Sequence, residues 1–182
     1  MLPTAFYEEI IAHAREGAPE EICGILSGKD GVVTGLYRAR NVAPTRIIDY
    51  TVDDQTLLKQ FEFEARGEMM IGIYHSHPES PAFPSATDAR QAFYPDAAYL
   101  ICSLEDPRRP VLRAYALIQS DPQRLPVDAV PPDAAPLRGD ETYRARYVGD
   151  QHQGRYDLYD LRSGEHAEWI ACRVEEIALL VV

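Results

Sequence analysis

The stretch MMIGIYHSHP, residues 69–78, is an apolar run of strand length that carries two histidines at its end and stops at a proline. Alternate side chains of a strand share a face, so His75 and His77 are expected to point to the same side of a sheet. Two imidazoles at this spacing can reach one metal ion. The pattern also occurs as a hydrogen-bonded core pair or as a surface coincidence, and the spacing alone leaves these alternatives open.

A possible third ligand follows downstream. Ten residues separate His77 from Asp88, and the loop between them contains three prolines that can turn the chain back. Ser85 and Asp88 also have the spacing of a capping box, which predicts a helix from Ser85 to about Phe93. The two interpretations are compatible, because a helix start beside the strand end would hold the carboxylate in place. Two histidines and one carboxylate leave a zinc ion with an open fourth position, which is typical of catalytic sites.

A hydrolytic zinc site also needs a general base, usually a carboxylate that is not itself a ligand. The segment PEEICGIL, residues 19–26, places Glu21 at the head of another apolar strand. With this segment the chain resembles the compact prokaryotic type of the JAMM (MPN+) zinc metalloprotease family. That family's pattern is a Glu before a Cys-Gly strand, then His-x-His-Pro, then Ser-x-x-Asp. The residues at its motif positions are Glu21, His75, His77, Ser85 and Asp88.

The resemblance covers roughly residues 1–120 and implies a catalytic zinc ion with the ligands His75, His77 and Asp88. It implies that Glu21 is the general base, although the neighbouring Glu20 leaves the choice open by one position.

For Ser85 the resemblance implies a hydrogen bond to the oxyanion of the tetrahedral intermediate, and a plain helix cap is the alternative. Ser76 is expected to face away from the metal and to hold the strand through hydrogen bonds. The implied fold class is α/β, a mixed central sheet flanked by helices of the cytidine-deaminase-like kind, followed by a small C-terminal β-rich module.

Periodicity and turn signals agree with this class. The strands expected besides the histidine strand are residues 21–27, 32–40, 47–52, 98–104 and 111–118. A first helix is expected to begin at Thr4 or Pro3 and to end at Gly17, and a second to run from Asp53 or Asp54 to Gly67. In the second helix, the residues expected to contact the core are Leu57, Leu58, Phe61 and Ala65.

Composition changes abruptly after Ser120, which predicts three parts: a JAMM/MPN+ domain over residues 1–120, a proline-rich linker over 121–140, and a β-rich module over 141–182. About forty residues are too few for a secure independent core. Trp169 and the apolar end, residues 177–182, are therefore expected to pack on the main domain or on a second subunit, as in a homodimer. The alternative is that this C-terminal module binds the substrate.

The formal net charge of −11 argues against a nucleic-acid-binding surface, which would need a basic patch. The 3 cysteines form no C-x-x-C pair, as expected in a reducing compartment. The N-terminus has no apolar region of the signal-peptide kind, and no apolar run is long enough to span a membrane. The expected location is the cytoplasm.

The resemblance implies hydrolysis of an amide or isopeptide bond after the C-terminal tail of a ubiquitin-like protein, of the sulfur-carrier kind for compact prokaryotic members. Such a tail would bind in an extended conformation as an additional strand at the edge of the sheet. Two alternatives remain open: a non-catalytic MPN scaffold and a DNA-repair-associated relative with the same metal motif. A zinc nucleobase deaminase would need a Pro-Cys-x-x-Cys ligand pair, which the chain lacks.

Overall fold

A computed structural model describes all residues, 1–182. The chain forms two compact units. The first contains Met1–Phe83, Asp96–Tyr115 and Ile177–Val182, and the second contains Pro84–Pro95 and Ala116–Glu176.

The helices are α1 (Thr4–Gly17), α2 (Asp54–Leu57), α3 (Gln60–Ala65) and α4 (Ala86–Arg90), with a 3-10 turn over Val127–Ala129. The strands are β1 (Cys23–Lys29), β2 (Val32–Ala39), β3 (Met69–His77), β4 (Ala98–Ser103), β5 (Val111–Gln119), β6 (Gln123–Pro126), β7 (Ala135–Leu137), β8 (Asp140–Gly149), β9 (Gln153–Asp160) and β10 (His166–Ile177).

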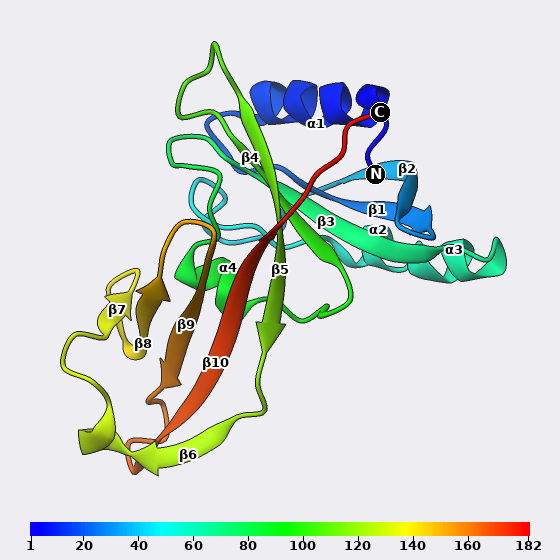
Figure 1. The fold of residues 1–182 in the computed structure, drawn as a ribbon. Coiled ribbons are helices and arrows are strands. Elements are labelled where there is room, and N and C mark those ends of the chain that lie inside the picture. The colour runs from blue at the N-terminus through cyan, green and yellow to red at the C-terminus, as the bar shows by residue number, and fades with distance from the viewer. The chain divides into compact units, whose positions relative to one another are not determined.

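The strands of the first unit follow the order β2-β1-β3-β4-β5. Strand β1 is antiparallel to both β2 and β3, β3 is parallel to β4, and β4 is antiparallel to β5. Helix α1 lies on one side of this sheet, and α2 and α3 lie on the other (Figure 1). The predicted α/β class, with a mixed sheet between helices, is confirmed.

Strand β3 is buried along its second half because helices cover both of its faces. Tyr74 belongs to the core that α1 covers through Ile10 and Ala14. His75 is the next residue, so it points to the opposite face. Burying a large apolar side chain contributes about 1.5–3 kcal/mol, so the α1 core fixes the face on which each β3 side chain lies.

In the second unit, β10 pairs with β9, β9 with β8, and β8 with β7, while β6 also pairs with β10. The buried Asp157 carboxylate joins the three longer strands. It accepts hydrogen bonds from Arg146 on β8 at 3.0 Å and from the Trp169 indole on β10 at 3.3 Å, and it pairs with Arg155 at 2.8 Å. A buried carboxylate is tolerated only when paired in this way.

Several local predictions need correction. The strand predicted over residues 47–52 is wrong, because the segment forms turns and retains only an isolated bridge between Asn41 and Val52. The second helix is broken into α2 and α3. Within it Leu58 and Phe61 are 57% and 61% exposed, because the inward face is instead that of Thr56 and Phe63.

The helix that begins after Ser85 ends at Arg90, earlier than the predicted Phe93. The predicted linker, residues 121–140, contains β6, the 3-10 turn and β7. The division at residues 120 and 140 remains a prediction about which parts fold independently.

The last residues of the chain belong to the first unit, where they pair with its start. The backbone N–H of Leu2 donates to Leu180 O at 2.8 Å, and that of Val182 donates to Leu2 O at 3.0 Å. Leu2 is fully buried there. None of the helices has the length and apolar character that a membrane crossing requires.

Candidate metal centre

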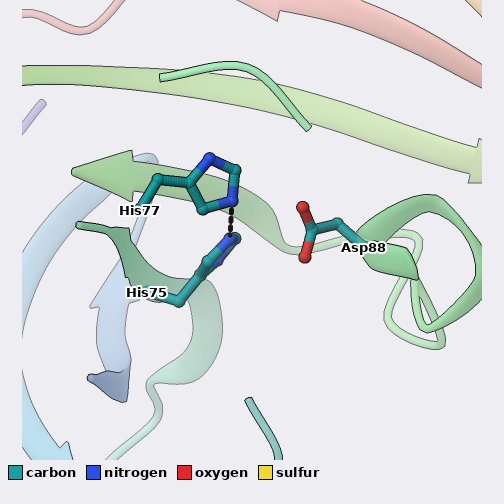
Figure 2. Close-up of side chains that lie close together, drawn as sticks. All are labelled: His75, His77 and Asp88. Atoms are coloured by element: carbon teal, nitrogen blue, oxygen red, sulfur yellow. Dashed lines mark hydrogen bonds between the residues drawn. The ribbon is translucent and has the colours of Figure 1, made fainter. Parts of the chain in front are cut away.

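The two histidines lie at the end of β3, where they are almost completely buried: His75 is 0% and His77 is 5% exposed. Their Nε2 atoms are 3.1 Å apart (Figure 2). The rings meet edge to face, with planes at 61°. The two side chains therefore lie on the same face of the strand, as the i, i+2 spacing predicted. Their Nε2 atoms are hydrogen-bonded to each other, as in the core-pair alternative, and the same two atoms could hold a metal ion between them.

A backbone carbonyl fixes the orientation of the His77 ring. The Nδ1 atom of His77 lies 2.9 Å from Pro81 O. A carbonyl only accepts hydrogen bonds, so Nδ1 carries the proton and Nε2 of the neutral ring presents its lone pair. Histidines that bind metals commonly donate their second ring N–H in this way.

Asp88 lies in the first turn of α4, and its position is set by the predicted capping box, which is confirmed. Ser85 Oγ accepts from the backbone N–H of Asp88 at 3.1 Å, and Asp88 Oδ2 accepts from the backbone N–H of Ser85 at 2.6 Å. A carboxylate has two oxygens, and the capping box uses only Oδ2. The cap is therefore compatible with a cation at Oδ1.

Each of His75, His77 and Asp88 offers a ligand atom, and these atoms lie within 4.8 Å of one another. The carboxylate and both imidazoles are turned toward a common space (Figure 2). Zinc–nitrogen bonds of about 2.0–2.1 Å at a tetrahedral angle place two nitrogens roughly 3.3 Å apart, near the separation of the two Nε2 atoms. A buried carboxylate also needs a compensating positive charge. This donor set could hold a metal ion.

Ser76 points to the opposite face and joins β3 to the head of β1, as predicted. Its Oγ accepts from the backbone N–H of Ile22 at 3.0 Å, and its own N–H donates to Ile22 O at 3.0 Å. The strand end that carries both histidines is held to β1 by these two bonds.

Glu21 stands two residues before Cys23, which lies opposite His75 in the β1–β3 pair. Directly opposed residues of an antiparallel pair share a face, so Glu21 is placed on the same side as the two histidines. Glu21 is buried, whereas Glu20 is only partly buried and pairs with Arg46 at 3.3 Å. Burial therefore favours Glu21 over its neighbour.

The thiol beside the histidines is not a ligand. Burial, together with the negative charges of Asp53 and Glu21, raises the pKa of Cys23 to about 12. The thiol therefore stays protonated, and a protonated thiol is a poor metal ligand.

Two residues of this region carry no signal in the sequence. Tyr50 is buried, and its ring lies against the His75 imidazole, with centroids 4.2 Å apart and planes at 18°. Asn41 holds the loop that carries Tyr50 and also contacts Glu21. Neither has a recognisable sequence spacing to the histidines, because Tyr50 meets His75 only in the folded chain and Asn41 acts on the loop that carries Tyr50.

A buried His-His-Asp set on a mixed α/β sheet is typical of a metal-dependent hydrolase. The family model described as prokaryotic homologs of the JAB domain matches residues 3–117, more than half of the chain. The chain belongs to this family. It is generally a family of metalloproteases, and the His-His-Asp set agrees with that character.

Named relatives are similar to this chain over part of its length. A desampylase of Haloferax volcanii is 42% identical over 103 residues, which cover 53% of this chain and 74% of that protein. A CysO-cysteine peptidase of Mycobacterium tuberculosis is 35% identical over 130 residues, covering 66% of this chain and 84% of that protein. The solution structure of a Desulfitobacterium hafniense protein is 37% identical with a TM-score of 0.56, covering 63% of this chain and 83% of that one.

Proposed function

We propose that the protein is a zinc-dependent metallopeptidase that hydrolyses an amide or isopeptide bond at the C-terminus of a ubiquitin-like protein of the sulfur-carrier kind. The observation that carries the proposal is the convergence of the ligand atoms of His75, His77 and Asp88 within 4.8 Å. We propose these three side chains as the zinc ligands, because two neutral nitrogens and one carboxylate suit zinc and leave one position open.

A zinc ion held by these residues would polarise the scissile carbonyl and lower the pKa of a water molecule beside it. In the proposed reaction the Glu21 carboxylate takes a proton from the attacking water. The carbon–nitrogen bond then breaks as Glu21 delivers that proton to the leaving amine. The buried position of Glu21 on the histidine face supports this role.

Ser85 is proposed to stabilise the oxyanion that develops on the scissile carbonyl oxygen. Its Oγ accepts a hydrogen bond from the backbone N–H of Asp88, which uses one lone pair of the hydroxyl. The O–H group can still donate, so capping and oxyanion binding are compatible in the same side chain.

The substrate class rests on the relatives, which include a desampylase, a CysO-cysteine peptidase and a probable TtuB-protein conjugate cleaving protease. The net charge of −11 suits a protein substrate better than a nucleic acid. All three cysteines are unpaired and buried, and on this ground we propose a reducing compartment, the cytoplasm.

The test is an activity screen with zinc-loaded protein and ubiquitin-like carriers that bear C-terminal extensions, read by intact mass. The expected result is loss of the extension by wild type, abolished by a chelator and restored by zinc. A protein that binds zinc and cleaves none of the carriers would instead be a scaffold, and the proposal would be wrong.

A further inference from the structure

The loop between β2 and α2 is organised around one side chain, that of Asn41. Its Nδ2 donates to Glu21 O at 2.8 Å and to Asp49 O at 2.9 Å. Its Oδ1 accepts from the backbone N–H groups of Ala43 at 2.9 Å and Thr51 at 3.1 Å. A carboxamide has two N–H donors and two acceptor lone pairs, so these four bonds use its full capacity. No other side chain of this size and shape supplies both kinds of group.

One of the four bonds reaches the proposed base. Glu21 precedes β1, and both of its backbone polar groups bind this loop: its carbonyl accepts from Asn41, and its N–H donates to Arg46 O at 2.7 Å. The loop therefore takes the place of a neighbouring strand at Glu21. The direction in which the Glu21 carboxylate points depends on a backbone that this loop holds.

Two more of the bonds flank the ring that contacts a proposed metal ligand. Asp49 and Thr51 are the residues on either side of Tyr50, and both bind the Asn41 side chain. The Tyr50 ring stacks on His75 at 4.2 Å. Asn41 therefore fixes the backbone of Tyr50 from both sides, and through it the contact with His75.

Loop closure does not depend on Asn41 alone. Two further bonds join the start of the loop to its end, and we call this part its neck. The backbone N–H of Arg40 donates to Asp53 Oδ2 at 2.9 Å, and that of Val42 donates to Thr51 O at 2.9 Å. Asp53 also caps α2. A loop without the Asn41 carboxamide would therefore remain attached at its ends while its interior loses its bonds.

We propose that Asn41 is a positioning residue that holds the base Glu21 and the ligand His75 in their relative places through the backbones of Glu21 and Tyr50. The inference rests on the proposed function for the role of Glu21. Its part concerning His75 can be measured without any substrate.

The experiment compares Asn41→Asp and Asn41→Ala with wild type and with Asp53→Ala in the full chain. Asp53→Ala is the matched control, because it removes neck and capping bonds of the same loop without touching Glu21 or Tyr50. Aspartate has the shape of asparagine and lacks the N–H donors. Thermal unfolding reports the loss of stability of each variant, so that activity and metal affinity are compared at known stability.

Supporting residues of metal sites typically contribute about 10–100-fold to metal affinity or activity. We expect the zinc Kd, measured by chelator competition, to rise about tenfold in both Asn41 variants, and their kcat to fall about 10–100-fold with little change in KM. Asp53→Ala should lose stability and keep both values within about twofold of wild type.

An Asn41→Asp protein with wild-type zinc Kd and kcat would overturn the inference. Equal losses in Asp53→Ala would overturn it too, because the effect would then follow from stability. If wild type cleaves no carrier, the proposed function fails, and the zinc Kd values still decide whether Asn41 positions His75.

Discussion

The Tyr50 ring lies parallel to the His75 imidazole at a centroid distance of 4.2 Å, and both side chains are buried. The Tyr50 ring covers one face of the imidazole and limits its rotation. A ligand whose orientation is fixed before the metal arrives loses less entropy on binding. The aromatic ring is thus part of the candidate metal centre, although it offers no ligand atom.

Replacing Tyr50 by Ala should weaken zinc binding about tenfold, in the range typical of residues that support metal ligands. Tyr50→Phe keeps the ring, so its zinc Kd should match wild type within about twofold. Chelator competition measures both values. Equal zinc affinity in all three proteins would show that the stack does not orient His75.

The proposed base can be separated from its neighbour by a pair of variants. Glu21→Gln should keep the fold and the zinc while turnover falls about 10²–10⁴-fold, the usual loss on removal of a general base. Glu20→Gln changes a partly exposed residue that pairs with Arg46, and this variant should remain active. Turnover on a cleavable carrier is the measurement. If Glu20→Gln is inactive and Glu21→Gln is active, the base is Glu20, and if both are active the mechanism is wrong.

Much of this site could be predicted because its signals are local. The i, i+2 spacing on a strand fixes the face of His75 and His77, and the Ser85–Asp88 spacing fixes a capping box whatever lies around it. Tyr50 could not be predicted in the same way. Its contact with His75 depends on a loop whose path follows from the side-chain hydrogen bonds of Asn41, and such bonds leave no periodic spacing in the sequence.

The failed predictions have the same physical origin. Residues 47–52 have strand-like composition, but the Asn41 carboxamide satisfies the backbone there and no strand partner is needed. Helical periodicity predicted that Leu58 and Phe61 lie in the core. The helix is instead broken between α2 and α3, and both side chains are exposed. Apolar spacing predicts which residues can share a face, and tertiary packing decides which face is buried.

Stability should depend on pH through His13, whose Nδ1 lies 3.1 Å from the Tyr74 hydroxyl. Burial and, to a smaller extent, the charge of Arg38 lower the pKa of His13 from 6.5 to about 4, against the opposing effect of Glu16 and Glu9. Between these values the unfolded chain binds the proton and the folded chain does not. The free energy of unfolding should therefore fall as the pH decreases from 6.5 to about 4.

Urea unfolding of chelated protein at several pH values measures this dependence. In His13→Gln the same decrease should be smaller, because the group that gains the proton on unfolding is absent. Chelation of both proteins keeps metal loss out of the comparison. Identical pH dependence in the two proteins would contradict the assignment to His13.

The division of the chain can be tested by truncation. We expect a chain that ends at Ser120 to keep zinc and peptide cleavage, because every proposed site residue precedes that point and the family match ends at residue 117. Ser85 and Asp88 belong to one compact unit with Ala116–Glu176, so loss of zinc from this chain would show that the removed residues hold Asp88 in place. The shortened chain should unfold at a lower temperature, since it lacks the residues that pair with Leu2. A chain that ends at Glu176 is the control, because it loses the residues that pair with Leu2 and keeps the rest of the C-terminal part. A folded, zinc-loaded product that cleaves no peptide would show that the C-terminal part contributes to the site.

The most direct test of the account is the zinc content of the purified protein after zinc supplementation and dialysis, measured by elemental mass spectrometry beside that of His77→Ala. Wild type should hold about one zinc per chain, and His77→Ala should lose most of it, because two remaining ligands hold zinc poorly. Wild-type protein with less than about a tenth of an equivalent, or a His77→Ala protein with as much zinc as wild type, would contradict the proposed metal centre.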